Sequence, residues 1–291
     1  MGKARPAMHA QAGYALWCAR SQRLFWSDAA AGRLRAWSPA SGESGSWRMP
    51  EALCCFALTA SADRLLLGLA SRLAFFDLAS GALAPICDVD AGVPATRLTD
   101  GRCDRQGRFV FGTGAGDPQA SGAFHRLNHD LSLERLPLGA AAFATGIGFS
   151  PDGRTMYYAD AVLGAIRRCD YHPCSGAITR PRTFVEAGAA PGRPGGAAVD
   201  AGGGLWSARP DTGQLLRFDP AGSVERVLDL AACGAGWPVF GGPDPGMLFL
   251  TTAQAGGPPA AAAPEGVLCI PAPGVQGLAE QRFLGRLPSR A

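Results

Sequence analysis

The chain has 291 residues, 47% of them hydrophobic and 18% charged, and it carries a formal net charge of +3. This composition is typical of a globular protein with a large core, and it excludes a disordered chain. No basic run points to nucleic acid or an anionic membrane as a partner, and no apolar run is long enough to span a membrane.

Residues 1–12 lack the apolar segment that a signal peptide needs, and we expect them to form a flexible N-terminus. The nine cysteines are odd in number and irregularly spaced along the chain. Without a secretion signal, this pattern favours reduced thiols in a cytoplasmic protein over a disulfide framework.

A pair of short strands joined by a turn recurs six times, and the copies begin at intervals of roughly 41 to 49 residues. The pairs are 24–28 with 33–37, 65–68 with 73–77, 109–112 with 123–127, 156–160 with 165–170, 205–208 with 214–219, and 248–252 with 266–270. Repeats of this kind indicate a β-propeller with one four-stranded sheet, or blade, in each repeat. The sequence therefore predicts an all-β, six-bladed β-propeller as a single domain over residues 13–291. Two β-sandwich domains are the alternative, but even spacing without a linker argues against them.

One repeat shows the local pattern most clearly. Ile147 and Phe149 precede a Ser-Pro-Asp-Gly turn at 150–153, and Met156 and Tyr158 follow it. The alternation with period two predicts strands that bury one face. Proline, aspartate and glycine in this order are typical of a tight turn between antiparallel strands.

The first strand of each blade lines the centre of a propeller, and polar residues there usually form the ligand site. The candidate lining segments directly precede the recurring pairs and are 13–17, 97–100, 145–149 and 195–200. We therefore expect a small-molecule ligand in a central channel.

Several motifs lie in register along almost the whole chain. They are T-D-G-R-C-D-R-Q-G-R at 99–108, T-G-I-G-F-S-P-D-G at 145–153 with Y-Y-A-D at 157–160, P-G-G at 194–196 with L-W at 205–206, F-G-G at 240–242, and T-T-A at 251–253. Together they resemble the SMP-30/gluconolactonase/LRE family, which includes regucalcin and luciferin-regenerating enzyme. The resemblance implies a six-bladed propeller, in agreement with the repeat count.

The resemblance also implies a divalent cation that polarises a lactone carbonyl and is held by a Glu, an Asn and an Asp. In this sequence those three positions fall on Gly13, Thr145 and Gly195, and a further substrate-binding Asn falls on Thr99. Glycine supplies no side-chain ligand, and a neutral hydroxyl is a poor ligand for a hard cation. We therefore expect no metal and no other cofactor.

Other positions that bind substrate in the family are retained. An Arg and an acidic residue correspond to Arg97 and Asp117, which could hold a polar ligand or could form a surface ion pair of little energetic value. Thr99 and Thr145 could donate hydrogen bonds to a ligand, or could be small residues tolerated without the cation. Asp100 is a candidate general base, although a turn aspartate that binds the next backbone amide is the favoured interpretation.

Three further features have simpler structural interpretations. Tyr14 follows the missing Glu and is expected to fill space more than to act as a phenolic acid. Asp160 and Asp200 recur at blade ends and are expected to cap turns. The C-x-x-H-x-C segment at 169–174 has neither the spacing nor the fourth ligand of a zinc site.

Two functions from different classes remain open. The first is an enzyme of lactonase descent that acts on a lactone or another small cyclic oxygenated metabolite without the family's cation. The second is a non-catalytic propeller that binds a ligand or a partner protein at the same place. The retention of Arg97 and Asp117 favours the enzyme slightly.

Overall fold

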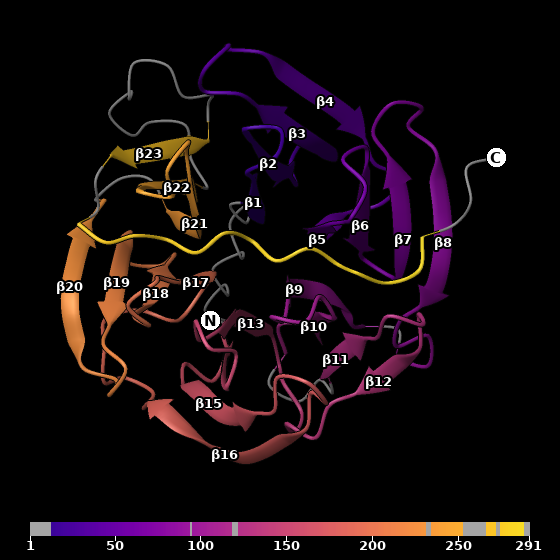
Figure 1. Cartoon of the computed structure of the whole chain (residues 1–291). Coiled ribbons are helices and arrows are strands. Elements are labelled where there is room, and N and C mark those ends of the chain that lie inside the picture. Colours follow the sequence, from indigo (N-terminus) through magenta and orange to yellow (C-terminus); the bar gives the residue numbers. More distant parts are fainter. Residues whose placement is uncertain are drawn as a thin grey trace, which may run out of the picture.

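The computed structural model describes residues 13–93, 95–117, 122–230, 234–252, 266–271 and 274–287. These residues form 23 strands and no helix, arranged as six antiparallel sheets around a common axis (Figure 1). The prediction of an all-β, six-bladed propeller is confirmed. The predicted flexible terminus, 1–12, lies outside the described residues, and the single domain over 13–291 stays a prediction. The described part of the chain has no helix that could cross a membrane.

Each blade consists of strands that follow one another in the chain. Blades 1 and 2 contain β1 (Ala15–Cys18), β2 (Arg23–Asp28), β3 (Arg33–Trp37), β4 (Ser44–Arg48), β5 (Leu53–Leu58), β6 (Arg64–Leu69), β7 (Arg72–Asp77) and β8 (Leu83–Asp88). Blades 3 and 4 contain β9 (Arg97–Cys103), β10 (Phe109–Gly114), β11 (Phe124–Leu127), β12 (Leu133–Arg135), β13 (Ala144–Phe149), β14 (Thr155–Asp160), β15 (Ile166–Tyr171) and β16 (Ile178–Val185). Blades 5 and 6 contain β17 (Ala197–Val199), β18 (Leu205–Arg209), β19 (Gln214–Phe218), β20 (Val224–Asp229), β21 (Ala235–Gly241), β22 (Met247–Thr252) and β23 (Val267–Pro271).

The six strand pairs found in the sequence are the second and third strands of the six blades. The expectation that the strands of the 147–158 region bury one face is wrong, because every residue of β13 and the central four of β14 are buried. Neighbouring blades pack face to face around the axis, so both faces of an inner strand are covered. Only outer strands such as β12 and β20 are largely exposed.

The ends of the ring meet between blades 6 and 1. Trp17 of β1 stacks on Phe249 of β22 with ring centroids 5.3 Å apart. The Thr251 hydroxyl donates a hydrogen bond of 2.7 Å to the Gly13 carbonyl oxygen. Aromatic packing and this hydrogen bond therefore help to join the first and last blades.

Aspartates cap turns at both ends of the blades, as the sequence predicts. Asp160 accepts hydrogen bonds from the backbone amides of Val162 and Leu163 at 2.9 and 3.2 Å. Asp200 is fully buried and accepts hydrogen bonds from the amides of Gly202 and Gly204. Both carboxylates replace backbone hydrogen bonds that the strands cannot make where they end.

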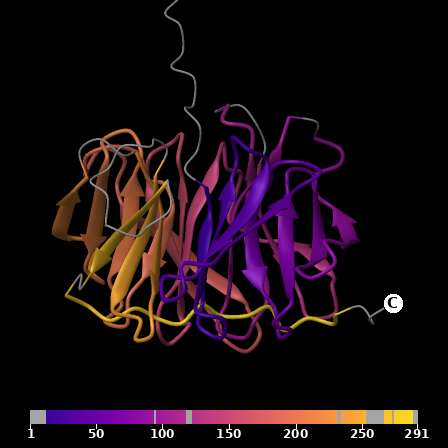
Figure 2. The same cartoon turned by 90° about the horizontal axis from the view of Figure 1, so that it is seen from above.

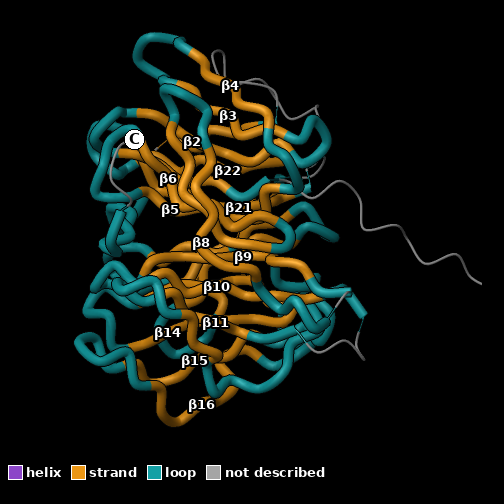
Figure 3. Tube along the Cα trace, turned by 90° about the vertical axis from the view of Figure 1, so that its right-hand side faces the viewer, coloured by secondary structure: helices purple, strands orange, loops and turns teal. Residues whose placement is uncertain are grey.

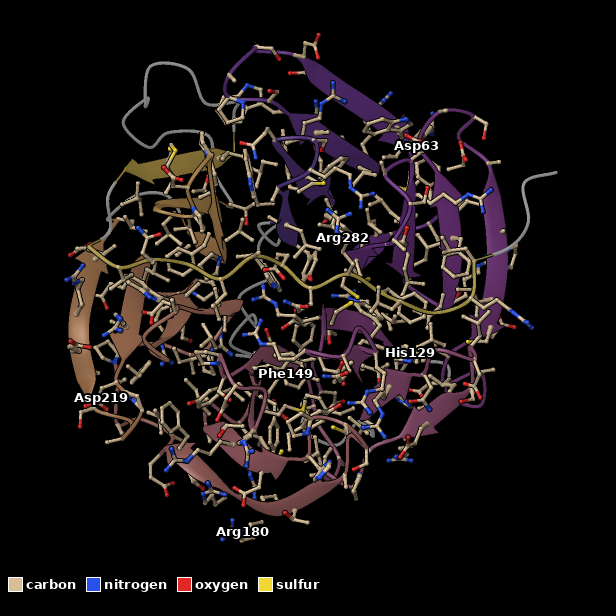
Figure 4. The ribbon with its side chains drawn as sticks, viewed as in Figure 1. Asp63, His129, Phe149, Arg180, Asp219 and Arg282 are labelled. Atoms are coloured by element: carbon tan, nitrogen blue, oxygen red, sulfur yellow. The ribbon has the colours of Figure 1, made fainter. Side chains whose placement is uncertain are left out.

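Residues 274–287, which we call the strap, cross one face of the ring (Figures 1 and 2). Gly277 forms a bridge with Asp200 of blade 5, and Phe283 forms one with Thr59 of blade 2. Arg282, labelled in Figure 4, donates a 3.2 Å hydrogen bond from Nη1 to the Thr59 carbonyl oxygen. The strap therefore ties together blades that lie on different sides of the axis. The loops gather on the two faces of the ring, with the strands between them (Figure 3).

Candidate functional site

The predicted site residues lie at the end of the axis where the inner strands begin. Thr99 and Thr145 are near the starts of β9 and β13, and Gly13 and Gly195 lie two residues before the first residues of β1 and β17. The opposite ends of the inner strands contact the strap, since the Leu58 carbonyl oxygen at the end of β5 accepts a hydrogen bond from the Phe283 amide. We call the end with Gly13, Thr99, Thr145 and Gly195 the mouth.

Neighbouring atoms occupy the space beside both mouth glycines. A Cβ atom on Gly13 would lie 1.4 Å from the backbone oxygen of Ser27, and one on Gly195 would lie 2.9 Å from Cγ of Pro210. Gly13 therefore cannot carry a side chain unless the backbone shifts, and Gly195 could carry one only if Pro210 moved.

Replacing Gly13 by alanine is expected to lower the free energy of unfolding by about 1–3 kcal/mol, because the new methyl group overlaps a backbone oxygen. Urea-induced unfolding measures the change. Gly92→Ala is the matched control, since a Cβ there meets nothing within 4 Å. An equal, small effect of both substitutions would show that the strand start at Gly13 moves aside freely.

The two mouth threonines differ in their hydrogen bonds. The Thr99 hydroxyl donates to the Ala144 carbonyl oxygen at 2.6 Å, so an internal partner satisfies it. The Thr145 hydroxyl is buried and has no hydrogen-bond partner. A buried hydroxyl without a partner carries a desolvation cost that a bound ligand could remove.

Asp100 is buried on the axis and is held by donors from three blades. Its Oδ1 accepts from the Gly101 amide at 2.7 Å and from Nε1 of Trp237 at 3.3 Å, and its Oδ2 accepts from the Ile147 amide at 3.0 Å. The bond to Gly101 is the one expected of a turn aspartate. A carboxylate has about four acceptor positions, so three donors leave one position for a further partner. Burial raises the pKa of Asp100.

Tyr14 fills space beside Asp100, as the sequence suggests. Its hydroxyl donates to the Gly101 carbonyl oxygen, and its ring lies edge-on to Phe56 and tilted against Trp237, at centroid distances of 5.1 and 6.2 Å. Burial raises the pKa of the Tyr14 hydroxyl well above its usual value. The Tyr14 ring therefore packs against both of the other aromatic rings. The sequence did not predict that Trp237 belongs to the site. No motif around it indicates a contact with Asp100 of β9, three blades away.

Arg97 and Asp117 are both exposed at the mouth end of blade 3. Arg97 begins β9 opposite Gly114 at the end of β10, and Asp117 follows three residues later. The structure thus brings the two predicted ligand-binding side chains to the same edge of one blade.

The donor set at the mouth does not fit the cation that the resemblance implies. Two of the four positions are glycines without side chains, and the Thr99 hydroxyl is used internally. Within the described ranges, no three or more His, Cys, Asp or Glu side chains come together in a way that could hold a metal ion. Hard cations prefer several anionic oxygen ligands. The C-x-x-H-x-C segment at 169–174 does not form such a group either. Cys169 is buried and Cys174 is exposed, so the two thiols do not face one common site.

Comparisons with known proteins support the family resemblance seen in the sequence. The family model described as "SMP-30/Gluconolactonase/LRE-like region" matches residues 14–254. The L-arabinolactonase of Azospirillum brasilense is 44% identical over 246 residues, which cover 83% of this chain and 80% of the relative. The 6-deoxy-6-sulfogluconolactonase of Pseudomonas putida is 32% identical over 244 residues, with 82% of each chain covered.

Two solved structures share the fold at low sequence identity. A luciferin-regenerating enzyme superposes with a TM-score of 0.84 at 20% identity, over 94% of this chain and 96% of its own. Regucalcin from Agrobacterium tumefaciens, described as a calcium-binding protein, superposes with a TM-score of 0.83 at 23% identity, over 96% and 95%. With the extent of the family match and the identity to the lactonases, the conclusion is that the chain belongs to the SMP-30/gluconolactonase/LRE-like family.

Proposed function

We propose that this protein hydrolyses a small sugar-derived lactone, or a similar cyclic oxygenated metabolite, at the mouth and without a divalent cation. The observation that carries the reaction class is the 44% identity to an L-arabinolactonase over 83% of the chain. A pentonolactonase of Haloferax volcanii is also 31% identical over 249 residues. Five-carbon aldonolactones are therefore the first substrates to test.

The mouth offers polar contacts for such a ligand. The unpartnered Thr145 hydroxyl can donate to a ring or hydroxyl oxygen, which relieves its own desolvation cost. Arg97 and Asp117 at the rim are exposed and can bind the hydroxyl groups of a sugar. Thr99 supports this site by holding the Ala144 carbonyl at the start of β13.

Asp100 is the proposed catalytic residue. A carboxylate whose pKa is raised is a stronger base than an exposed one, and the remaining acceptor position of Asp100 can take a proton from water. The water oxygen then forms a bond to the lactone carbonyl carbon, and the ring C–O bond breaks. The proton passes to the leaving oxygen, so that lactone and water give one hydroxy acid.

A non-catalytic propeller that binds a ligand at the same place is the alternative. The observation that favours it is the occupancy of Asp100, which already accepts three hydrogen bonds from backbone and indole N–H groups. A carboxylate so bound is a weaker base than a free one.

Turnover of five- and six-carbon aldonolactones, followed by acid release, separates the two functions. We expect hydrolysis that Arg97→Ala greatly reduces. A rise in melting temperature with a lactone and no acid release would support the binding protein instead. Neither turnover nor stabilisation with any lactone would contradict the proposed substrate class.

Replacing Thr145 by valine is expected to weaken lactone binding by up to about tenfold, the value of one hydrogen bond, without loss of stability. Thr99→Val is the matched control at the mouth. It removes the 2.6 Å bond to Ala144 and should lower the free energy of unfolding by about 1 kcal/mol. Calorimetry of binding and urea unfolding of both variants give the comparison. If Thr145→Val destabilised the protein like its control and left affinity unchanged, the Thr145 hydroxyl would have an internal partner.

A further inference from the structure

The strap carries one acidic residue, Glu280, and its carboxylate reaches an arginine on the axis. Oε1 of Glu280 lies 3.4 Å from Nη1 of Arg102, and both side chains are only 10% exposed. The pair helps to line a cavity of about 20 Å³ under the strap, together with Phe149, which Figure 4 labels near the centre of the ring. A cavity of this size has room for about one water molecule, so solvent screens the two charges weakly.

Arg102 links the strap end of the axis to the mouth. Asp100 and Arg102 are two residues apart in β9, so their side chains leave the strand on the same face. That face points to the axis, because Asp100 there meets Trp237 of blade 6. The Nε of Arg102 is buried without a hydrogen-bond partner. The guanidinium is held by the ion pair with Glu280 and by a hydrogen bond with the Tyr14 side chain.

Burial and the charge of Arg102 have opposite effects on the pKa of Asp100. Burial raises the pKa of Asp100, and Arg102 works in the opposite direction. The other titratable groups that face this cluster are Tyr14, which directly precedes β1, Cys55 of β5, Cys103 of β9, and Arg105, which follows β9 and lines the same cavity. The Tyr14 phenol and the two thiols are buried. Glu280 is the strap carboxylate that balances Arg102, and it also faces the cation of Arg105. Removing Glu280 would leave the full field of Arg102 on Asp100.

We propose that Glu280 is a positioning residue: it holds the Arg102 guanidinium at the strap end of the axis, and through it the strap sets the protonation of Asp100 at the mouth. The catalytic consequence rests on the proposed function, whereas the electrostatic link between strap and mouth does not. A ligand or variant that loosens the strap would therefore change the chemistry at the opposite end of the propeller.

Titration of Asp100 by carbon NMR of labelled carboxyl groups tests the link without a substrate. The Asp100 signal is identified by its absence from Asp100→Asn. Glu280→Gln, which keeps the shape and removes the charge, should lower the titration midpoint of Asp100 by about one pH unit. The double variant Arg102→Gln/Glu280→Gln removes both charges and should return the midpoint toward the wild-type value. Glu43→Gln removes an exposed carboxylate that pairs with Arg23 on blade 1, and it should leave the midpoint unchanged.

The outcomes separate this inference from the proposed function. A midpoint that falls in Glu280→Gln and recovers in the double variant supports it, even if no lactone is hydrolysed. If Glu280→Gln lowers the melting temperature while the Asp100 midpoint stays fixed, Glu280 only fastens the strap and the proposal is wrong. If the protein hydrolyses a lactone, the acid limb of its kcat/KM profile should shift to lower pH in Glu280→Gln, by the same amount as the Asp100 midpoint.

Discussion

Replacing Asp200 by alanine is expected to lower the free energy of unfolding by about 3–5 kcal/mol. The carboxylate is fully buried and accepts hydrogen bonds from Nε of Arg217 at 2.7 Å and from Nε1 of Trp206 at 2.8 Å. The substitution would take from the largely buried Arg217 guanidinium its buried partner and leave it paired with the more exposed Glu225. It would also disturb the residue that forms the bridge to Gly277 of the strap.

Urea unfolding of Asp200→Ala and of a control, Asp219→Ala, measures this effect. Asp219 lies at the rim of the ring (Figure 4) and also accepts three backbone hydrogen bonds, but its turn is exposed. Its loss should therefore cost only about 0.5–2 kcal/mol, as for an exposed cap. Equal losses in the two variants would mean that the buried ion pair adds nothing beyond turn capping.

Replacing Asp100 by asparagine is expected to reduce kcat for lactone hydrolysis by roughly 10²- to 10⁴-fold, the usual contribution of a general base. Asparagine has nearly the same shape, so the fold should be retained. In the wild type, kcat/KM should fall as the pH drops through the pKa of Asp100, because the base must be ionised. Because burial raises the pKa of Asp100, that limb should lie at a higher pH than for an exposed aspartate.

Stability gives an independent readout of the same carboxyl group. Because its pKa is raised in the folded state, that state binds the proton more tightly, and stability is lost as the pH rises from the unfolded pKa through the folded one. Asp100→Asn should not show this loss. Asp160→Asn, at a turn of blade 4, is the control for activity. Full activity in Asp100→Asn would show that Asp100 is not the general base and serves only as a turn residue.

The fold could be predicted because it depends on local signals. Each blade contains a central strand pair with its turn residues, as at 150–153, and six such pairs at one period leave few architectures. Burial could not be predicted from the same pattern. The alternation around Ile147 and Phe149 suggests one covered face, whereas packing between blades covers both. That packing depends on how the ring closes, which local periodicity does not specify.

The site could be predicted only as far as the identity of single residues determines it. The missing side chains at Gly13 and Gly195 are evident from the sequence, but the Ser27 oxygen beside Gly13 is not. Trp237 and Glu280 are more than one hundred residues from the side chains that they contact, Asp100 and Arg102. Such contacts depend on the assembled ring, so no local pattern could have revealed them.

Lactone hydrolysis after exhaustive chelation, with metal analysis of the same sample, tests the central claim most directly. Because the mouth lacks anionic ligands at Gly13, Thr145 and Gly195, we expect turnover to be unchanged by the chelator and no divalent metal to be present in stoichiometric amount. Loss of turnover on chelation, restored by one equivalent of Ca²⁺, Zn²⁺ or Mn²⁺, would contradict the claim of a cation-free site.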